Sequence, residues 1–218
     1  LVSQRMAPVD LAILRYAGCI PVALVAWLLF RERVRLQVSW MQLAVLLLLA
    51  GPPYHCLVIS GYAYATAGAG AVIVSGLMPA FSLAVPFLIN GDRPPPGAVA
   101  GTTAAVAGVA LFSADAGAGF AFEPPALVIF GIGALGWALL NYVVRRWALD
   151  PLQLTNSLAI WSALFLPAFV YARGTDQLPA LDGEMLLQVG YHGVLVAYAA
   201  TFCFYVAVKR CGAALASA

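Results

Sequence analysis

The sequence predicts an all-α integral membrane protein, a helical bundle built from inverted five-helix repeats. The first observation is composition: 63% of the 218 residues are hydrophobic and 9% are charged, whereas soluble domains carry about 25% charged residues. The second is that apolar runs of roughly 17 to 25 residues recur along the chain, the length that a helix needs to cross the hydrocarbon core. The third is an internal repeat. Together these observations place the chain in the lipid bilayer.

Each apolar run between polar connectors is predicted to be one spanning helix. Strands of a membrane barrel would be shorter and would alternate apolar with polar residues. In chain order, the seven predicted helices are Leu11–Phe30, Met41–Ala63, Ala71–Ile89, Ala98–Ser113, Ala126–Tyr142, Leu152–Tyr171 and Gly190–Val208.

Basic residues are unevenly divided between the connectors, and this predicts the orientation. Eight of the eleven basic residues lie in alternate connectors, namely Arg31, Arg33, Arg35, Arg93, Arg145, Arg146, Lys209 and Arg210. Cytoplasmic loops are rich in Lys and Arg, so the first helix is expected to run from outside to inside. Arg15, one turn inside the outer end of this helix, can reach the headgroups by snorkelling. A charge that faces the substrate is the alternative.

Two landmarks indicate a repeat whose halves have opposite orientation. Pro8 matches Pro151 at an offset of 143, and Gly68 matches Gly212 at an offset of 144. Such offsets superimpose helices that run in opposite directions, a signature of secondary transporters. We predict a first repeat over residues 1–113, without its first helix, and a second over 114–218, without its last two helices. The parent protein would then have about ten helices, of which about seven are present here.

Three stretches carry a family resemblance. Residues 7–18 read APVDLAILRYAG, residues 61–94 read GYAYATAGAGAVIVSGLMPAFSLAVPFLINGDRP, and residues 133–147 read GALGWALLNYVVRRW. In order and spacing they resemble the EamA-type transporters of the drug/metabolite transporter superfamily. That family usually has Gly-Glu-Arg after its fourth helix, whereas this chain has Gly91, Asp92 and Arg93. The resemblance implies ten helices in two repeats and the transport of small metabolites across a bacterial cytoplasmic (inner) membrane.

A polar break interrupts the second predicted helix near its midpoint. Residues 50–56 read AGPPYHC, so Pro52 and Pro53 cannot donate to the carbonyls of Leu48 and Leu49 and should bend the helix. At membrane depth, irregular backbone is tolerated only against protein or a water-filled cavity. Tyr54 and His55 are therefore predicted to form a cavity wall that binds substrate. The alternative is a packing kink in which a neighbouring carbonyl satisfies His55.

Other candidate substrate-binding residues follow from their positions on the predicted helices. Trp137 and Asn141 are four residues apart and share one helical face, as do Tyr198, Thr201 and Tyr205. Asn156 and Trp161 lie on the sixth predicted helix. Trp and Tyr residues near helix ends often only anchor the protein at the interface, which is the alternative for each of them. The predicted substrate-binding residues are Tyr54, His55, Trp137, Asn141, Trp161, Tyr198 and Thr201, with Pro52 and Pro53 as the helix break.

The chain is predicted to be a transporter and not an enzyme. No Asp or Glu lies inside the predicted helices, and no catalytic or phosphate-binding motif is present; an integral-membrane enzyme and a non-transporting scaffold are the rival interpretations. We expect no cofactor, no metal and no nucleic acid as partner, because the four cysteines lie singly and the net charge is only +2. Expected partners are a small-molecule substrate and the lipid bilayer. Gly97 and Gly101 form a GxxxG ridge that suggests a scaffold helix, and a homodimer through this ridge is a further interpretation.

Overall fold

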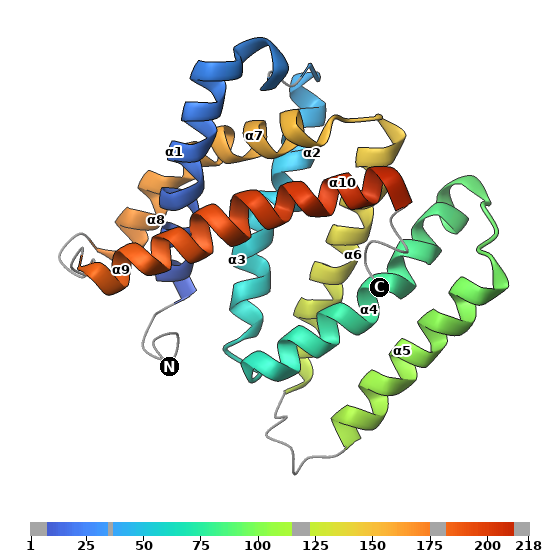
Figure 1. The fold of residues 1–218 in the computed structure, drawn as a ribbon. Coiled ribbons are helices and arrows are strands. Elements are labelled where there is room, and N and C mark those ends of the chain that lie inside the picture. The colour runs from blue at the N-terminus through green and yellow to red at the C-terminus, as the bar shows by residue number, and fades with distance from the viewer. Residues whose placement is uncertain (1–7, 35–36, 115–122, 175–181, 212–218) are drawn as a thin grey trace. The chain divides into compact units, whose positions relative to one another are not determined.

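The computed structural model describes residues 8–34, 37–114, 123–174 and 182–211, and within these ranges the chain is helical with no strand. Figure 1 shows the helices in chain order. Their bounds are α1 Pro8–Val34, α2 Trp40–Ala50, α3 Pro52–Gly61, α4 Ala67–Asn90, α5 Pro96–Ala114, α6 Pro124–Arg146, α7 Pro151–Ser162, η2 Ala163–Phe165, α8 Leu166–Arg173, α9 Gly183–Gln188, η4 Val189–Ala200 and α10 Thr201–Cys211. The predicted all-α class is confirmed.

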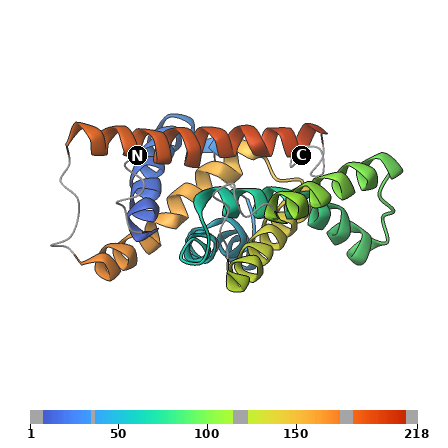
Figure 2. The ribbon, with the colours of Figure 1, turned by 90° about the horizontal axis from the view of Figure 1, so that it is seen from below.

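Each of the seven predicted helices corresponds to one helix or to several consecutive helices of the structure. Except for Trp40–Gly61, the stretches are longer than predicted, mainly because their ends are polar or proline-containing turns that hydropathy leaves out. For example, the side chain of Asp150 accepts from the backbone N–H groups of Leu152 and Gln153, and so begins α7 at Pro151. The last stretch begins at Gly183 instead of Gly190, and Figures 1 and 2 show α9, η4 and α10 as one continuous rod.

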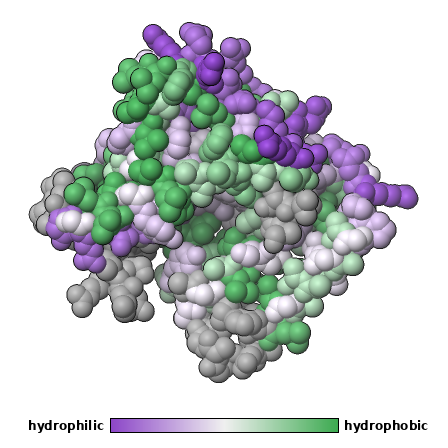
Figure 3. All heavy atoms as spheres, in the orientation of Figure 1, coloured by the Kyte–Doolittle hydropathy of each residue, from purple (hydrophilic) through white to green (hydrophobic). Residues whose placement is uncertain are grey.

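The described helices have the length and composition of membrane spans. Six are long and apolar enough to cross a bilayer, while α5 is apolar over the shorter stretch Pro96–Leu111. Large apolar side chains point outward, among them Leu28, Leu88 and Leu111, each more than 70% exposed. Figure 3 shows apolar residues over much of the viewed face, and hydrophilic residues at the C-terminal end of α1. Exposed apolar surface on this scale fits contact with lipid, and the chain is a multi-pass membrane protein.

The chain divides into two compact units, each made of two segments. Unit 1 comprises Leu1–Cys56 and Leu149–Val206, and unit 2 comprises Leu57–Ala148 and Ala207–Ala218. These units are not the two predicted repeats, because each draws helices from both halves of the sequence. The repeat boundary between residues 113 and 114 stays a prediction, and its landmark Gly212 lies outside the described residues.

In unit 1, α1 packs against η4, α7 and α8. Its closest approach to η4 is made by two glycines. A Cβ atom added to Gly18 would lie 2.5 Å from the carbonyl oxygen of Val189 and 2.7 Å from the Cα of Gly193. Both glycines are therefore required for the backbones to come this close, as small residues permit in membrane helices. Ala12 and Ala23 on α1 are also buried.

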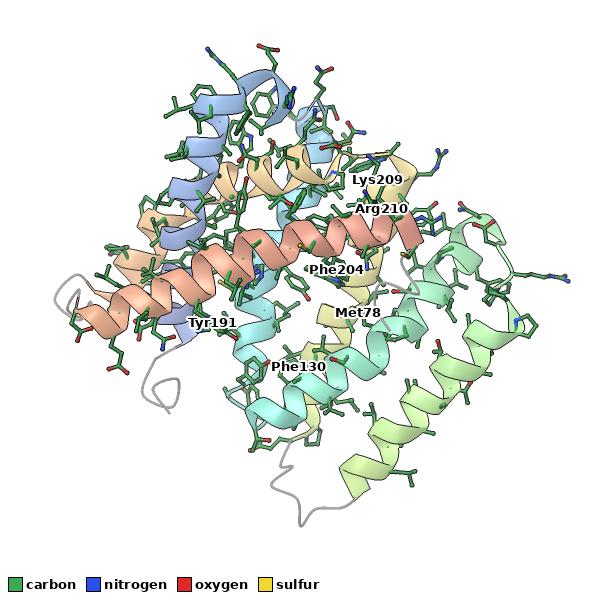
Figure 4. All side chains as sticks on the ribbon, viewed as in Figure 1. Met78, Phe130, Tyr191, Phe204, Lys209 and Arg210 are labelled. Atoms are coloured by element: carbon green, nitrogen blue, oxygen red, sulfur yellow. The ribbon has the colours of Figure 1, made fainter. Side chains whose placement is uncertain are left out.

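In unit 2, α4 packs against both α6 and α5. Ile73, Ala126 and Phe130 form a buried core against Val58 and Leu77, and Figure 4 labels Phe130 on α6. Cβ atoms added to Gly61 and Gly70 would lie 2.8 Å and 2.6 Å from the Phe130 ring. Because the ring fills the space that a larger residue would need, it holds α3 and α4 against α6.

The GxxxG ridge of α5 was predicted to mark a scaffold helix, and the described residues leave this prediction untested. Nothing lies within 4 Å of a Cβ atom added to Gly97, Gly101 or Gly108. Instead, α5 packs on α4 through Val109, whose side chain lies against Gly76. A small residue on α4 thus accepts a branched residue from α5. The homodimer interpretation is untested by this arrangement.

Candidate functional site

The helix break is present and lies one residue before the two prolines. α2 ends at Ala50, Gly51 is extended with φ −88° and ψ −163°, and α3 begins at Pro52. The Gly51 N–H still donates to the Leu47 carbonyl at 2.8 Å. Prolines have no N–H with which to continue the ladder. The single bent helix predicted over Met41–Ala63 is therefore two helices that meet at Gly51.

His55 lies one turn after the break and has two close neighbours for one ring nitrogen. Its Nδ1 lies 3.0 Å from the Tyr16 hydroxyl on α1 and 3.0 Å from the Gly51 carbonyl oxygen. Nδ1 accepts from Tyr16 when it lacks a proton and donates to Gly51 when it carries one. In the alternative interpretation of a packing kink, a neighbouring carbonyl satisfies His55, and here that carbonyl belongs to Gly51. The tautomer of His55 determines whether Nδ1 bonds to Gly51 or to Tyr16.

Aromatic rings surround His55 within unit 1. Tyr54 lies edge-on to the imidazole with ring centroids 5.3 Å apart, and Tyr16 does so at 6.0 Å. The other face of this group is closed by Phe169, which stacks on Tyr16 at 6.0 Å. Sequence reasoning did not select Tyr16. A tyrosine hydroxyl within an otherwise apolar helix, next to Arg15, is the signal that identifies it, since a buried hydroxyl needs a partner.

A second polar pair joins α7 to η4. The Tyr198 hydroxyl donates to Asn156 Oδ1 at 3.0 Å. Asn156 is completely buried, and its Nδ2 has no hydrogen-bond partner among the described residues. A buried amide donor without a partner costs about 1–3 kcal/mol. Asn156 is therefore positioned to donate to a group that the described residues do not supply.

Asn156 lines a cavity in unit 1. The cavity has a volume of about 670 Å³, and its lining residues are Leu24, Trp27, Arg31, Val34, Val38, Trp40, Leu43, Asn156, Ser157, Ile160 and Trp161. The volume is in the range of small-molecule pockets. Of the predicted substrate-binding residues, Trp161 lines the cavity. Tyr198 is connected to the cavity wall by its hydrogen bond to Asn156.

Three tryptophans and one arginine give this cavity its chemistry. Trp40 and Trp161 pack edge-to-face with centroids 5.5 Å apart. The guanidinium of Arg31 lies 4.7 Å from the centroid of the Trp27 ring, a cation–π contact. Flat apolar walls, one cation and a buried amide donor that lacks a partner among the described residues suit a small organic solute that carries an apolar body and a hydrogen-bond acceptor.

The remaining predicted substrate-binding residues do not line this cavity. Trp137 and Asn141 are on α6 in unit 2; Asn141 is completely buried, and neither polar atom of its side chain has a partner among the described residues. Thr201 is in unit 1, where its hydroxyl donates to the Val196 carbonyl at 3.2 Å. That bond reaches five residues back, as expected at the end of the π-helical segment η4. The Thr201 hydroxyl is thus used within its own helix.

No metal centre is formed by the described residues, which contain no group of three or more His, Cys, Asp or Glu able to hold a metal ion. Cys19 is buried, and Cys56, Cys203 and Cys211 are exposed; all four have free thiols.

Comparisons with known proteins agree with the fold. The profile described as the EamA-like transporter family matches residues 1–114. A solved structure titled "Crystal structure of protein" is 23% identical with a TM-score of 0.71, and the alignment covers 97% of this chain and 75% of that chain. At this identity the likeness concerns the fold alone. The comparison with curated proteins gave no match.

Proposed function

Because the chain belongs to the EamA-like transporter family, a group of membrane transporters in the drug/metabolite transporter superfamily, we propose that it moves small organic metabolites or drugs across the bacterial cytoplasmic membrane. Transport proceeds by alternating access around a binding cavity at membrane depth. Members of the family are transporters and not enzymes, which argues against a membrane enzyme.

One observation carries the location of the substrate site: Asn156 is buried, its Nδ2 donor has no partner among the described residues, and it lines the tryptophan-rich cavity. Intramembrane polar groups usually face substrate pathways because their burial is costly otherwise. The solute would accept a hydrogen bond from Asn156 and place its apolar part against Trp161. Arg31 favours solutes with a negatively charged or electron-rich end.

Irregular helices in unit 1 support alternating access. α2 and α3 meet at a non-helical Gly51, and η4 is π-helical between α9 and α10. Discontinuous helices are common at the substrate sites of secondary transporters, and a break is a place where two helix segments can change their angle. Tyr54 and His55 next to the break are proposed as a further part of the solute pathway.

Substitution of Asn156 tests the site. Solutes are first identified by comparing the metabolites exported by cells with and without the full-length gene. For an identified solute, Asn156→Ala should raise the half-saturating concentration in proteoliposomes about fivefold to tenfold, because one hydrogen bond of about 1 kcal/mol or more is lost. Tyr198→Phe, which leaves the amide in place, should have a smaller effect.

Thr155→Ala is the matched control for this experiment. Thr155 is the adjacent buried polar residue on α7, its hydroxyl has no partner among the described residues, and it does not line the cavity. We expect it to transport like the unsubstituted protein. Equal transport by Asn156→Ala and Thr155→Ala, at equal amounts of folded protein, would remove Asn156 from the site.

A further inference from the structure

Unit 2 contains a second cavity, which is basic and separate from the residues assigned to transport. It has a volume of about 420 Å³ and is formed where α4 and α6 end. Its lining residues are Ser82, Leu83, Pro86, Asn90, Asp92, Arg93, Pro94, Pro95, Ala138, Tyr142, Arg145 and Arg146. Three of these are arginines and one is an aspartate, so the lining carries a net charge of +2.

The three arginines that line the cavity come from two parts of the chain. Arg145 and Arg146 form the last turn of α6, and Arg93 follows the C-terminus of α4. Asp92, an acidic residue, also lines this cavity. Guanidinium groups form strong paired hydrogen bonds with phosphate oxygens.

Polar contacts and backbone geometry hold the cavity wall in place. The Tyr142 hydroxyl on α6 donates to Asn90 Oδ1 on α4 at 2.9 Å, and Asn90 Nδ2 donates to Asp92 Oδ2 at 3.1 Å. Gly91, in the left-handed conformation with φ 76°, ends α4 and turns the chain toward Arg93. Pro94 and Pro95 then restrict the connector. The arginines are thus carried by a wall with fixed geometry.

The electrostatic setting requires that the arginines themselves bind the anion. α4 and α6 both end at this cavity, and the carbonyls of a helix C-terminus carry partial negative charge. These carbonyls stabilise Arg145 and Arg146 but offer no N–H donors to an anion. Recognition would therefore depend on the guanidinium groups, which must also outweigh Asp92.

We propose that this cavity binds a phosphate-bearing anion, through Arg93, Arg145 and Arg146. The basic residues lie on the side that the charge asymmetry predicts to be cytoplasmic. Basic pockets between membrane helices on that side bind the phosphates of anionic lipid headgroups, and a soluble phosphate has the same chemistry. The proposal does not depend on which solute is transported.

Binding is measured on the purified full-length protein with two probes. Phosphatidylglycerol is compared with phosphatidylcholine in nanodiscs, with bound lipid counted by native mass spectrometry. Inorganic phosphate is titrated against the protein in neutral detergent by calorimetry. Saturable binding of phosphatidylglycerol without phosphate binding assigns the site to a lipid, and phosphate binding assigns it to a soluble anion. If neither probe binds above the phosphatidylcholine background, the proposal is wrong.

Substitutions then locate the binding. Arg145→Gln with Arg146→Gln should weaken it about 30-fold, from the usual contribution of two basic side chains near the membrane surface. The matched control is Lys209→Gln with Arg210→Gln. These residues form the last turn of α10, labelled in Figure 4, and do not line the cavity, so the same charge is removed elsewhere.

The control pair should change binding by less than about threefold, because these exposed charges do not line the cavity and are screened by salt. Equal losses in the two pairs would mean general surface attraction and would overturn the cavity assignment. Arg93→Gln, on an exposed connector, gives an independent variant if the α6 pair fails to fold. It should weaken binding about fivefold.

Discussion

At the scale of residues, His55 has two alternative hydrogen-bond partners for one ring nitrogen. One ring nitrogen lies 3.0 Å from both Tyr16 and Gly51, so its protonation determines which partner it uses. The bond to Gly51 stays within its own helix break, while the bond to Tyr16 connects the break to α1. A change of tautomer would therefore alter the link between α1 and the broken helix.

Substitutions at His55 and Tyr54 test whether these residues contact solute. We expect His55→Gln to keep most transport because an amide still forms a hydrogen bond of similar reach. His55→Ala should lower apparent solute affinity about fivefold, as should Tyr54→Phe if its hydroxyl binds solute. Uptake into proteoliposomes at several pH values is the measurement.

The pH series distinguishes a hydrogen-bonding from a proton-carrying role. If His55 carries protons, His55→Gln should abolish the pH dependence of transport, because glutamine does not titrate. Unchanged transport in His55→Ala and Tyr54→Phe would leave the stretch as a structural kink. The search for substrate contacts would then rest on the tryptophan-rich cavity.

At the scale of elements, the break at Gly51 divides one hydrophobic run into two helices, α2 and α3. α2 is begun by Ser39, whose hydroxyl accepts from the Gln42 N–H while the Gln42 side chain accepts from the Ser39 N–H. α3 begins with proline, which suits the first turn of a helix. The two segments are thus specified independently, and the angle between them is not fixed by a continuous hydrogen-bond ladder.

Replacement of Pro52 and Pro53 by alanine tests whether the break serves transport. Alanine supplies the missing N–H groups and favours helix, so α2 and α3 should join into one helix. We expect transport to fall severalfold while the protein stays folded, as judged by its size-exclusion profile. Full activity in the double-alanine protein would show that transport does not need the break.

At the scale of the whole molecule, charge asymmetry and apolar length determine how the chain lies in the membrane. Pairs of basic residues within the described residues end α1 and α6, with Arg31 and Arg33 on one and Arg145 and Arg146 on the other. Both helices are predicted to run inward, so these ends should share the cytoplasmic side.

Site-directed labelling checks this orientation. In a protein without its four native cysteines, single cysteines are placed at Gln37, in the first predicted cytoplasmic connector, and at Glu184, at the start of α9. Both positions are exposed. An impermeant maleimide should label Glu184→Cys in intact cells and Gln37→Cys only after permeabilisation. Labelling of both from the same side would contradict the predicted arrangement of spans.

Local features of the sequence determined the helices. Apolar runs specify spans because lipid cannot hydrogen-bond an open backbone, and the run from Trp40 to Gly61 is broken where Pro52 and Pro53 lack N–H groups. The family could also be identified at this level, since the order and spacing of several weak stretches suffice. The side-chain contacts of the candidate site did not follow from such features.

Only the tertiary structure decided which polar residues meet. Asn156 and Tyr198 are 42 residues apart and Tyr16 and His55 are 39 apart, and each pairing depends on how two helices are rotated about their axes. That rotation is set by close contacts such as Gly18 against Gly193, not by the hydropathy of either helix. Because nearly every face of these helices is apolar, periodicity does not reveal which face turns inward, and only packing selects it.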